Sequence, residues 1–109
     1  MRIHNIFQLG EHSLGKEEIF ETLCKDERIH IERIISSGQK SQPDTWYQEE
    51  NNEFVVLLKG RASLEFENGK IIHLTQGDHI LIPSGLKHRV SYTSKMPHCI
   101  WLAVHFKSK

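Results

Sequence analysis

Apolar and polar residues alternate along most of this chain with a period of two, which is typical of β-strands that bury one face. Turn-forming residues separate the alternating runs, and the clearest pair is Asn68-Gly69, which predicts a tight type I′ hairpin turn. Seven or eight short strands without intervening helices indicate an all-β fold, an antiparallel sandwich or barrel. The expected strands cover residues 29–36, 53–59, 62–67, 70–74, 79–83, 88–92 and 99–106.

A helical period occurs only near the N-terminus, in residues 13–26. Ile19, Phe20 and Leu23 form an apolar stripe at helical spacing there, and Ser13 or Gly15 can cap the first turn. We therefore expect an N-terminal segment, residues 1–28, with a short helix that packs on a β-barrel domain of residues 29–109.

The period of two also assigns side chains to faces. In residues 53–59, Glu53 shares one face with Val55 and Leu57, and the other face is apolar as well, so we expect this strand to be covered on both sides. A carboxylate at the start of such a strand lies at the mouth of the barrel. In residues 88–92, His88 and Tyr92 share a face.

Composition excludes some classes of partner. At 109 residues the chain forms one domain, and its fourteen basic and fourteen acidic side chains cancel without a basic run, which argues against nucleic-acid binding. No stretch reaches the length of about eighteen apolar residues that a membrane span needs, and no secretory signal is evident, so we expect a cytoplasmic protein without a membrane partner. Cys24 and Cys99 are expected to be buried, reduced thiols, with a disulfide as the alternative.

The segment "GDHILIPSGLKH" has a distinctive spacing of Gly77, Pro83, Gly85 and His88. This spacing resembles the second conserved motif of the cupins. Glu53, separated from Gly60 by six residues, resembles the second half of the first cupin motif. The resemblance covers roughly Ile29 to Phe106 and implies a double-stranded β-helix (jelly-roll) barrel, commonly a homodimer, with a pocket inside. It does not imply one reaction, because cupins perform many.

The same resemblance implies a metal site, although its two upstream histidines are replaced. They would stand at Trp46 and Gln48 or, with the shorter spacing of some cupins, at Tyr47 and Glu49. We expect Gln48, Glu53 and His88 to hold a divalent metal such as Fe, Mn, Ni or Zn. Participation of Glu49 would favour harder ions such as Mn or Fe(II). A hydrogen bond between Glu53 and a neighbouring loop or His88 is the alternative without a metal. The expected pocket walls are Trp46, Leu57 and Tyr92.

The remaining histidines carry no motif. His73, His79 and His105 lie on expected strands and could approach the pocket, but we expect solvent-facing or hydrogen-bonded side chains. The function that these observations indicate is a cupin that binds a divalent metal or a small molecule, with an oxygenase or isomerase reaction compatible with the site. The alternatives are a metal-free cupin that binds or senses a small molecule without catalysis and, less favoured, a purely structural or partner-binding role.

Overall fold

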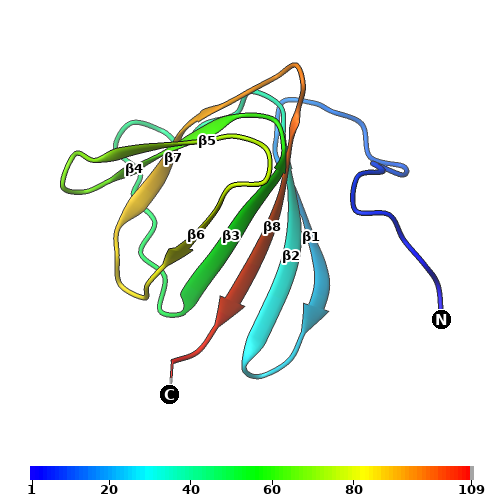
Figure 1. Ribbon diagram of the computed structural model, residues 1–109, viewed down its shortest axis with the longest axis horizontal. Coiled ribbons are helices and arrows are strands. Elements are labelled where there is room, and N and C mark those ends of the chain that lie inside the picture. The colour runs from blue at the N-terminus through cyan, green and yellow to red at the C-terminus, as the bar shows by residue number, and fades with distance from the viewer. Residues whose placement is uncertain (109) are drawn as a thin grey trace.

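The structure is a computed structural model that describes residues 1–108, and it consists of two antiparallel sheets (Figure 1). The first sheet has the strand order β1-β2-β8-β3-β6, and the second has the order β5-β4-β7. The strands are β1 (Ile19–Lys25), β2 (Ile29–Ser36), β3 (Asn52–Lys59), β4 (Ala62–Phe66), β5 (Ile71–Leu74), β6 (His79–Ile82), β7 (His88–Thr93) and β8 (Cys99–Phe106).

Seven strands lie where the alternation predicts them, but the predicted helix is wrong. Residues 19–25 form β1, which pairs with β2 in an antiparallel register that places Ile19 opposite Ile35. The ion pair between Glu21 and Arg33 joins the same two strands. Pairing with β2 gives the backbone of β1 hydrogen-bond partners, and this tertiary interaction outweighs a weak local helical preference. No helix occurs within residues 1–108, so none is long and apolar enough to cross a membrane.

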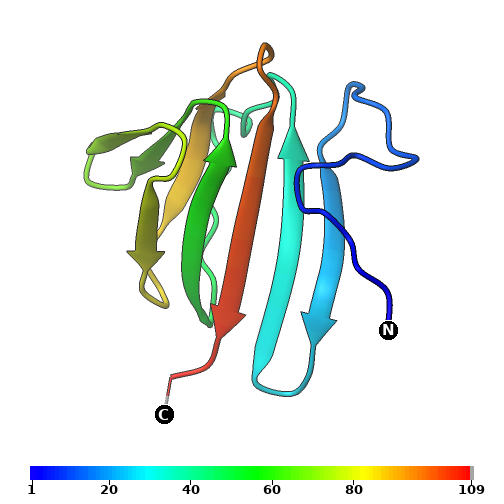
Figure 2. The ribbon, with the colours of Figure 1, turned by 45° about the vertical axis from the view of Figure 1, so that its right-hand side comes forward.

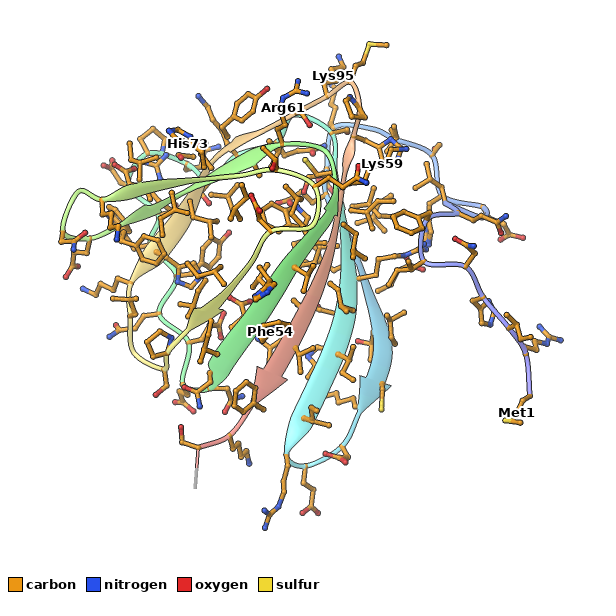
Figure 3. All side chains as sticks on the ribbon, in the orientation of Figure 1. Met1, Phe54, Lys59, Arg61, His73 and Lys95 are labelled. Atoms are coloured by element: carbon orange, nitrogen blue, oxygen red, sulfur yellow. The ribbon has the colours of Figure 1, made fainter. Side chains whose placement is uncertain are left out.

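The chain before β1 forms an arm that leaves the sheets (Figure 2). Met1, labelled in Figure 3, lies at its far end. The arm is attached by Arg33, which donates hydrogen bonds to the backbone carbonyls of Ile6 and Gln8. His12 also contacts Glu21, with 3.0 Å between its Nε2 and the Glu21 Oε2.

The hairpin between β4 and β5 is centred where the sequence predicts it, but its turn type differs. The amide of Gly69 donates to the carbonyl of Phe66, and among residues 1–108 only glycines have a positive φ. Asn68 therefore does not adopt the positive φ that a type I′ turn requires, and Gly69, with φ of 88°, takes the left-handed position alone.

Leu57 lies at the centre of the packing between the sheets, with no exposed surface. It faces the second sheet together with Glu53 and Val55, as the period of two predicts. The buried apolar cluster consists of Val55, Leu57, Ala62, Leu64, Phe66, Leu74, Ile82, Cys99 and Trp101. Four of these residues, Val55, Leu64, Ile82 and Trp101, also line a cavity between the sheets.

Both cysteines are free thiols, but only Cys99 is buried. Cys24 lies on the edge strand β1 and is exposed, because the predicted helix that would have buried it is a strand at the margin of the sheet.

Candidate functional site

A cavity of about 160 Å³ lies between the two sheets. Its walls come from every strand except β5 and from the segments before β1 and β3, so residues far apart in the sequence meet there. Glu53 and His105 lie at the end where β3 begins and β8 finishes, with the other imidazole and carboxylates near them except Glu18. Glu18 lies toward the other end and accepts a hydrogen bond from Ser36. The apolar lining is Phe20, Ile34, Val55, Leu64, Ile82, Val90, Trp101 and Ala103.

Glu53 lies between two histidines inside this cavity. Its Oε1 is 3.5 Å from Nε2 of His88, and its Oε2 is 3.6 Å from Nε2 of His105. The register of the strands explains the arrangement, because Glu53 at the start of β3 lies directly opposite His105 on β8. Glu53 and His105 each expose 13% of the side chain and His88 exposes 8%, so solvent screens these interactions only weakly.

His88 is held in place on both sides of its ring. Its Nδ1 donates to the backbone carbonyl of Leu86 at 3.1 Å, which leaves Nε2 directed toward Glu53. Burial lowers the pKa of His88, but the hydrogen bonds with Glu53 and the Leu86 carbonyl and the negative charges of Glu53 and Glu49 outweigh it, so the pKa lies above its ordinary value. His88 therefore keeps its proton to a higher pH than a free histidine.

His105 connects the pair to a second carboxylate. Its Nε2 is 2.9 Å from Oε1 of Glu32, and this hydrogen bond is the main cause of a raised pKa of His105. Burial partly opposes the rise, and the charges of Glu53, Glu32 and Glu49 add to it. His88, Glu53, His105 and Glu32 thus form one continuous chain of alternating imidazoles and carboxylates.

His30 completes a group of donors beside His105. The two imidazole rings have centroids 5.6 Å apart, and Nε2 of His30 lies 2.9 Å from Oγ1 of Thr22. One donor atom each from His30, Glu32 and His105 lie within 4.8 Å of one another. Glu32 and His105 line the cavity, while His30 lies in the rim outside it, so the three residues mark the mouth.

The donor chemistry of His30, Glu32 and His105 fits a borderline divalent metal. Two imidazoles and one carboxylate suit Zn²⁺, Fe²⁺ or Ni²⁺. Metal–ligand distances of about 2.0 to 2.2 Å place neighbouring donor atoms roughly 3 to 3.5 Å apart. The 2.9 Å separation already present between Glu32 and His105 is close to that spacing.

In the segment before β3, the residues that face the cavity are not Trp46 and Gln48, which the longer spacing of the first cupin motif predicts. Tyr47 and Glu49 line the cavity, which agrees with the shorter of the two spacings. Gln48 instead directs its side-chain amide to the carbonyl of Gly85, at 3.0 Å. Trp46 also lies outside the lining and has its ring 5.9 Å from the guanidinium of Arg89. The backbone bridge between Tyr47 and His88 fixes this alternation.

The other two expected wall residues also lie outside the cavity lining. Leu57 is in the core next to it, deeper than Val55. Tyr92 is 47% exposed and faces away, because β7 contains a bulge: Ser63 pairs with Tyr92 and the next residue, Leu64, pairs with Val90. The extra residue, Ser91, reverses the alternation, so Val90 faces the cavity and Tyr92 faces solvent.

Glu53 and His88 are neighbours, as the sequence predicted. The group of His30, Glu32 and His105 was not predicted. The available signal was that His30 and Glu32 are two residues apart on a strand, so they share a face. Which face it is depends on the pairing of β2 with β8, and one sequence does not reveal that register. His73 and His79 are peripheral as expected, with His73 bonded to Ser63 and His79 exposed beside Phe54. The ligand role predicted for Gln48, Glu53 and His88 stays a prediction.

Comparisons with solved structures support the fold described above. The chain is similar to a provisionally assigned mannose-6-phosphate isomerase from Ralstonia eutropha JMP134, with 34% identity, a TM-score of 0.90 and coverage of 99% of this chain and 100% of that one. A cupin superfamily protein from Desulfitobacterium hafniense DCB-2 matches at 14% identity and a TM-score of 0.76, over 89% of this chain and 84% of that one. A cupin protein from Methanocaldococcus jannaschii matches at 14% identity and a TM-score of 0.71, over 98% and 94%. The last two similarities show the fold alone.

A search of curated proteins gave no match to this chain. A family model described as a cupin domain matches residues 33–105, which is more than half of the chain and contains Glu53, His88 and His105. Together with the two sheets and the 34% identical structure, this match shows that the chain belongs to the cupin family.

Proposed function

We propose that this cupin is a metal-dependent isomerase of small carbonyl compounds, with a divalent cation at the mouth of the cavity and a proton-transferring pair inside it. His30, Glu32 and His105 would hold the cation. When bound there, such an ion supplies Lewis acidity that polarises a carbonyl oxygen. The observation that carries the proposal is the position of Glu53 between the imidazoles of His88 and His105 in an apolar cavity.

Glu53 is suited to take a proton from a carbon next to a carbonyl. Its two oxygens lie 3.5 Å from Nε2 of His88 and 3.6 Å from Nε2 of His105, so the carboxylate is held in place beside the apolar part of the cavity. His88 is suited to return a proton, because its pKa lies above the ordinary value and its Nδ1 is fixed by the Leu86 carbonyl, which leaves Nε2 directed toward Glu53. A proton that leaves one carbon can thus return to the neighbouring one, and when a hydroxyl proton also moves between the two oxygens the net change is an aldose–ketose isomerisation.

The similarity to a provisionally assigned mannose-6-phosphate isomerase supports this reaction class. It supports an isomerase rather than an oxygenase, although both were compatible with the sequence. The likeness supports no particular sugar, since the cavity of this chain decides which substrates fit.

Exchange of carbon-bound protons with solvent tests the proposed reaction without knowledge of the natural substrate. Hydroxyacetone in D₂O, incubated with the Zn²⁺-, Mn²⁺- or Ni²⁺-loaded protein, is expected to gain deuterium next to its carbonyl faster than in buffer with the same ion, as followed by NMR. Glu53→Gln should remove this acceleration, and Glu50→Gln, a change of the same kind just outside the cavity lining, should retain it. Equal exchange with and without the protein for every ion would contradict the isomerase.

A second candidate is a metal-free cupin that binds a small molecule without catalysis. The specific observation in its favour is that Nε2 of His105 and Oε1 of Glu32 form a hydrogen bond of 2.9 Å without a metal. This candidate predicts ligand binding without metal uptake or proton exchange, and so the measurements of metal content and deuterium incorporation distinguish it from the first.

A further inference from the structure

Among residues 1–108, four carboxylates and no lysine or arginine line the cavity. The carboxylates belong to Glu18, Glu32, Glu49 and Glu53, and the other titratable side chains of this described lining are those of His88, His105 and Tyr47. The end of the molecule opposite the cavity mouth, where β3 finishes and β8 begins, carries Lys59, Arg61 and Lys95 (Figure 3). Outside the mouth the rim is mixed, because Lys25, Arg28 and Lys107 lie there with Asp26 and Glu27.

Carboxylates outnumber imidazoles in the cavity lining by four to two. Protonation of both His88 and His105 would thus not balance four ionised carboxylates, of which Glu49 lies on the exposed side of the lining. When both imidazoles are neutral and a divalent cation binds at the mouth, its charge would not balance them either. An anion that enters this low-dielectric space would be repelled in either state, whereas a cation would be stabilised.

Aromatic side chains add a second feature that favours a cation. Phe20, Tyr47 and Trp101 line the same cavity, and Phe20 and Tyr47 are 61% and 45% exposed, so their rings are open to a ligand that enters. The face of an aromatic ring attracts an ammonium group, and carboxylates beside such rings strengthen the preference. The apolar walls around Val55, Ile82 and Val90 leave room for a hydrocarbon body.

The size of the cavity limits the ligand further. Its volume of about 160 Å³ is below the roughly 300 to 1,000 Å³ that is common for ligand pockets, and is close to the roughly 150 Å³ that accommodates benzene. A phosphorylated hexose is larger than this space and brings a dianion into it. The substrate in the name of the 34% identical protein is therefore a poor match to this cavity on both size and charge.

We propose that the cavity takes small primary amines in their protonated form, with an apolar body of about the size of a benzene ring, and rejects phosphorylated sugars. This inference goes beyond the proposed isomerase, because it concerns which ligands the cavity binds and does not depend on the reaction. Binding of an amine depends on the carboxylates and aromatic rings of the cavity, and so it can be measured in protein without metal.

A series of nearly isosteric ligands tests the charge preference. Isothermal titration calorimetry of the EDTA-treated protein at pH 7 would compare benzylamine, benzyl alcohol, benzoate and mannose 6-phosphate. Benzylamine should bind about tenfold more tightly than benzyl alcohol, and benzoate and mannose 6-phosphate should show no binding. Benzoate or mannose 6-phosphate binding as tightly as benzylamine would overturn the proposal, as would the absence of benzylamine binding. A failure of metal uptake or proton exchange in other experiments would leave this result unaffected.

Two matched variants test whether a carboxylate of the cavity lining causes the preference for benzylamine over benzyl alcohol. Glu49→Gln removes a charge from the lining and should reduce the advantage of benzylamine over benzyl alcohol several-fold. Glu50→Gln removes the charge of the next residue, which is exposed and outside the lining, and should leave the advantage unchanged. An equal effect of the two substitutions would assign the preference to the net charge of the protein and would overturn a specific amine site.

Discussion

Glu53 influences both histidines of the cavity, because one of its oxygens faces His88 and the other faces His105. Glu53 raises the pKa of His88 through a hydrogen bond and through its negative charge. It raises the pKa of His105 through its negative charge. Burial acts in the opposite direction on both rings. A change at Glu53 should therefore alter the pKa of both imidazoles, although Glu32 has the largest effect on His105.

Replacement of Glu53 by glutamine should lower the pKa of both histidines in the metal-free protein. A neutral amide removes the negative charge that favours the imidazolium, while burial continues to disfavour it. The larger fall is expected at His88, for which Glu53 supplies a hydrogen bond as well as its charge, because His105 retains Glu32. NMR titration of the histidine ring protons measures both values.

The matched control for this titration is Glu50→Gln, which changes a carboxylate outside the cavity lining. It should leave both pKa values within experimental error of the unchanged protein. Unaltered titration of His88 in Glu53→Gln would contradict the contact between the two side chains.

At the scale of elements, the strands were predictable because alternation is a local property. Seven expected strands coincide with β2 to β8 to within one or two residues at their ends. The predictions were wrong where pairing with another strand determines the conformation. β1 is a strand because β2 lies beside it, and Tyr92 turns outward because β7 carries a bulge opposite β4. The pairing of β8 with β2 and β3 likewise brings His105 to Glu32 and Glu53, and no local pattern contains that register.

The connection between β3 and β4 depends on Gly60. Its φ is 94°, and a Cβ at this position would lie 2.7 Å from Sγ of Cys99 and 2.9 Å from the carbonyl oxygen of His98. Gly60→Ala therefore combines a disfavoured backbone conformation with a clash against the start of β8. We expect a loss of about 2 kcal/mol or more in the free energy of unfolding, measured by urea denaturation.

Gly77 provides the control for this substitution. Its φ is 93°, but a Cβ there would meet no atom within 4 Å. Gly77→Ala should cost only the backbone strain, about 1 kcal/mol. An equal loss in both variants would contradict the close approach of Gly60 to β8.

At the scale of the whole molecule, the outer face of the five-stranded sheet is apolar and only half-buried. This face is opposite to the one that carries Glu53 and His105, and Phe54 projects from it (Figure 3). Its apolar residues are Ile29, Ile31, Phe54, Val56, Leu81, Leu102, Val104 and Phe106. The sequence predicted that both faces of β3 are covered, and within residues 1–108 the chain itself leaves this face partly open.

We propose that a second copy of the chain covers the outer face, in keeping with the dimer that the cupin resemblance implied. Contiguous apolar patches on a sheet are typical of protein interfaces. Light scattering coupled to size-exclusion chromatography should give the mass of a dimer. Leu81→Asp, at a position 54% exposed in the single chain, should shift the protein to a monomer.

Ile71→Asp is the matched control, because Ile71 is 49% exposed on β5 in the other sheet. It should leave the dimer intact. A monomeric unmodified protein, or a dimer that persists in Leu81→Asp at low concentration, would contradict an interface on this face.

The measurement that tests the account most directly is the stoichiometry and affinity of metal binding to the untagged protein. Elemental analysis and calorimetry with Zn²⁺ should give about one ion per chain. His30→Ala and His105→Ala should each weaken binding by at least on the order of tenfold, while His73→Ala and Gln48→Ala should not weaken it. Metal content well below one ion per chain, or affinity unchanged in His30→Ala and His105→Ala, would contradict a metal site at the mouth of the cavity.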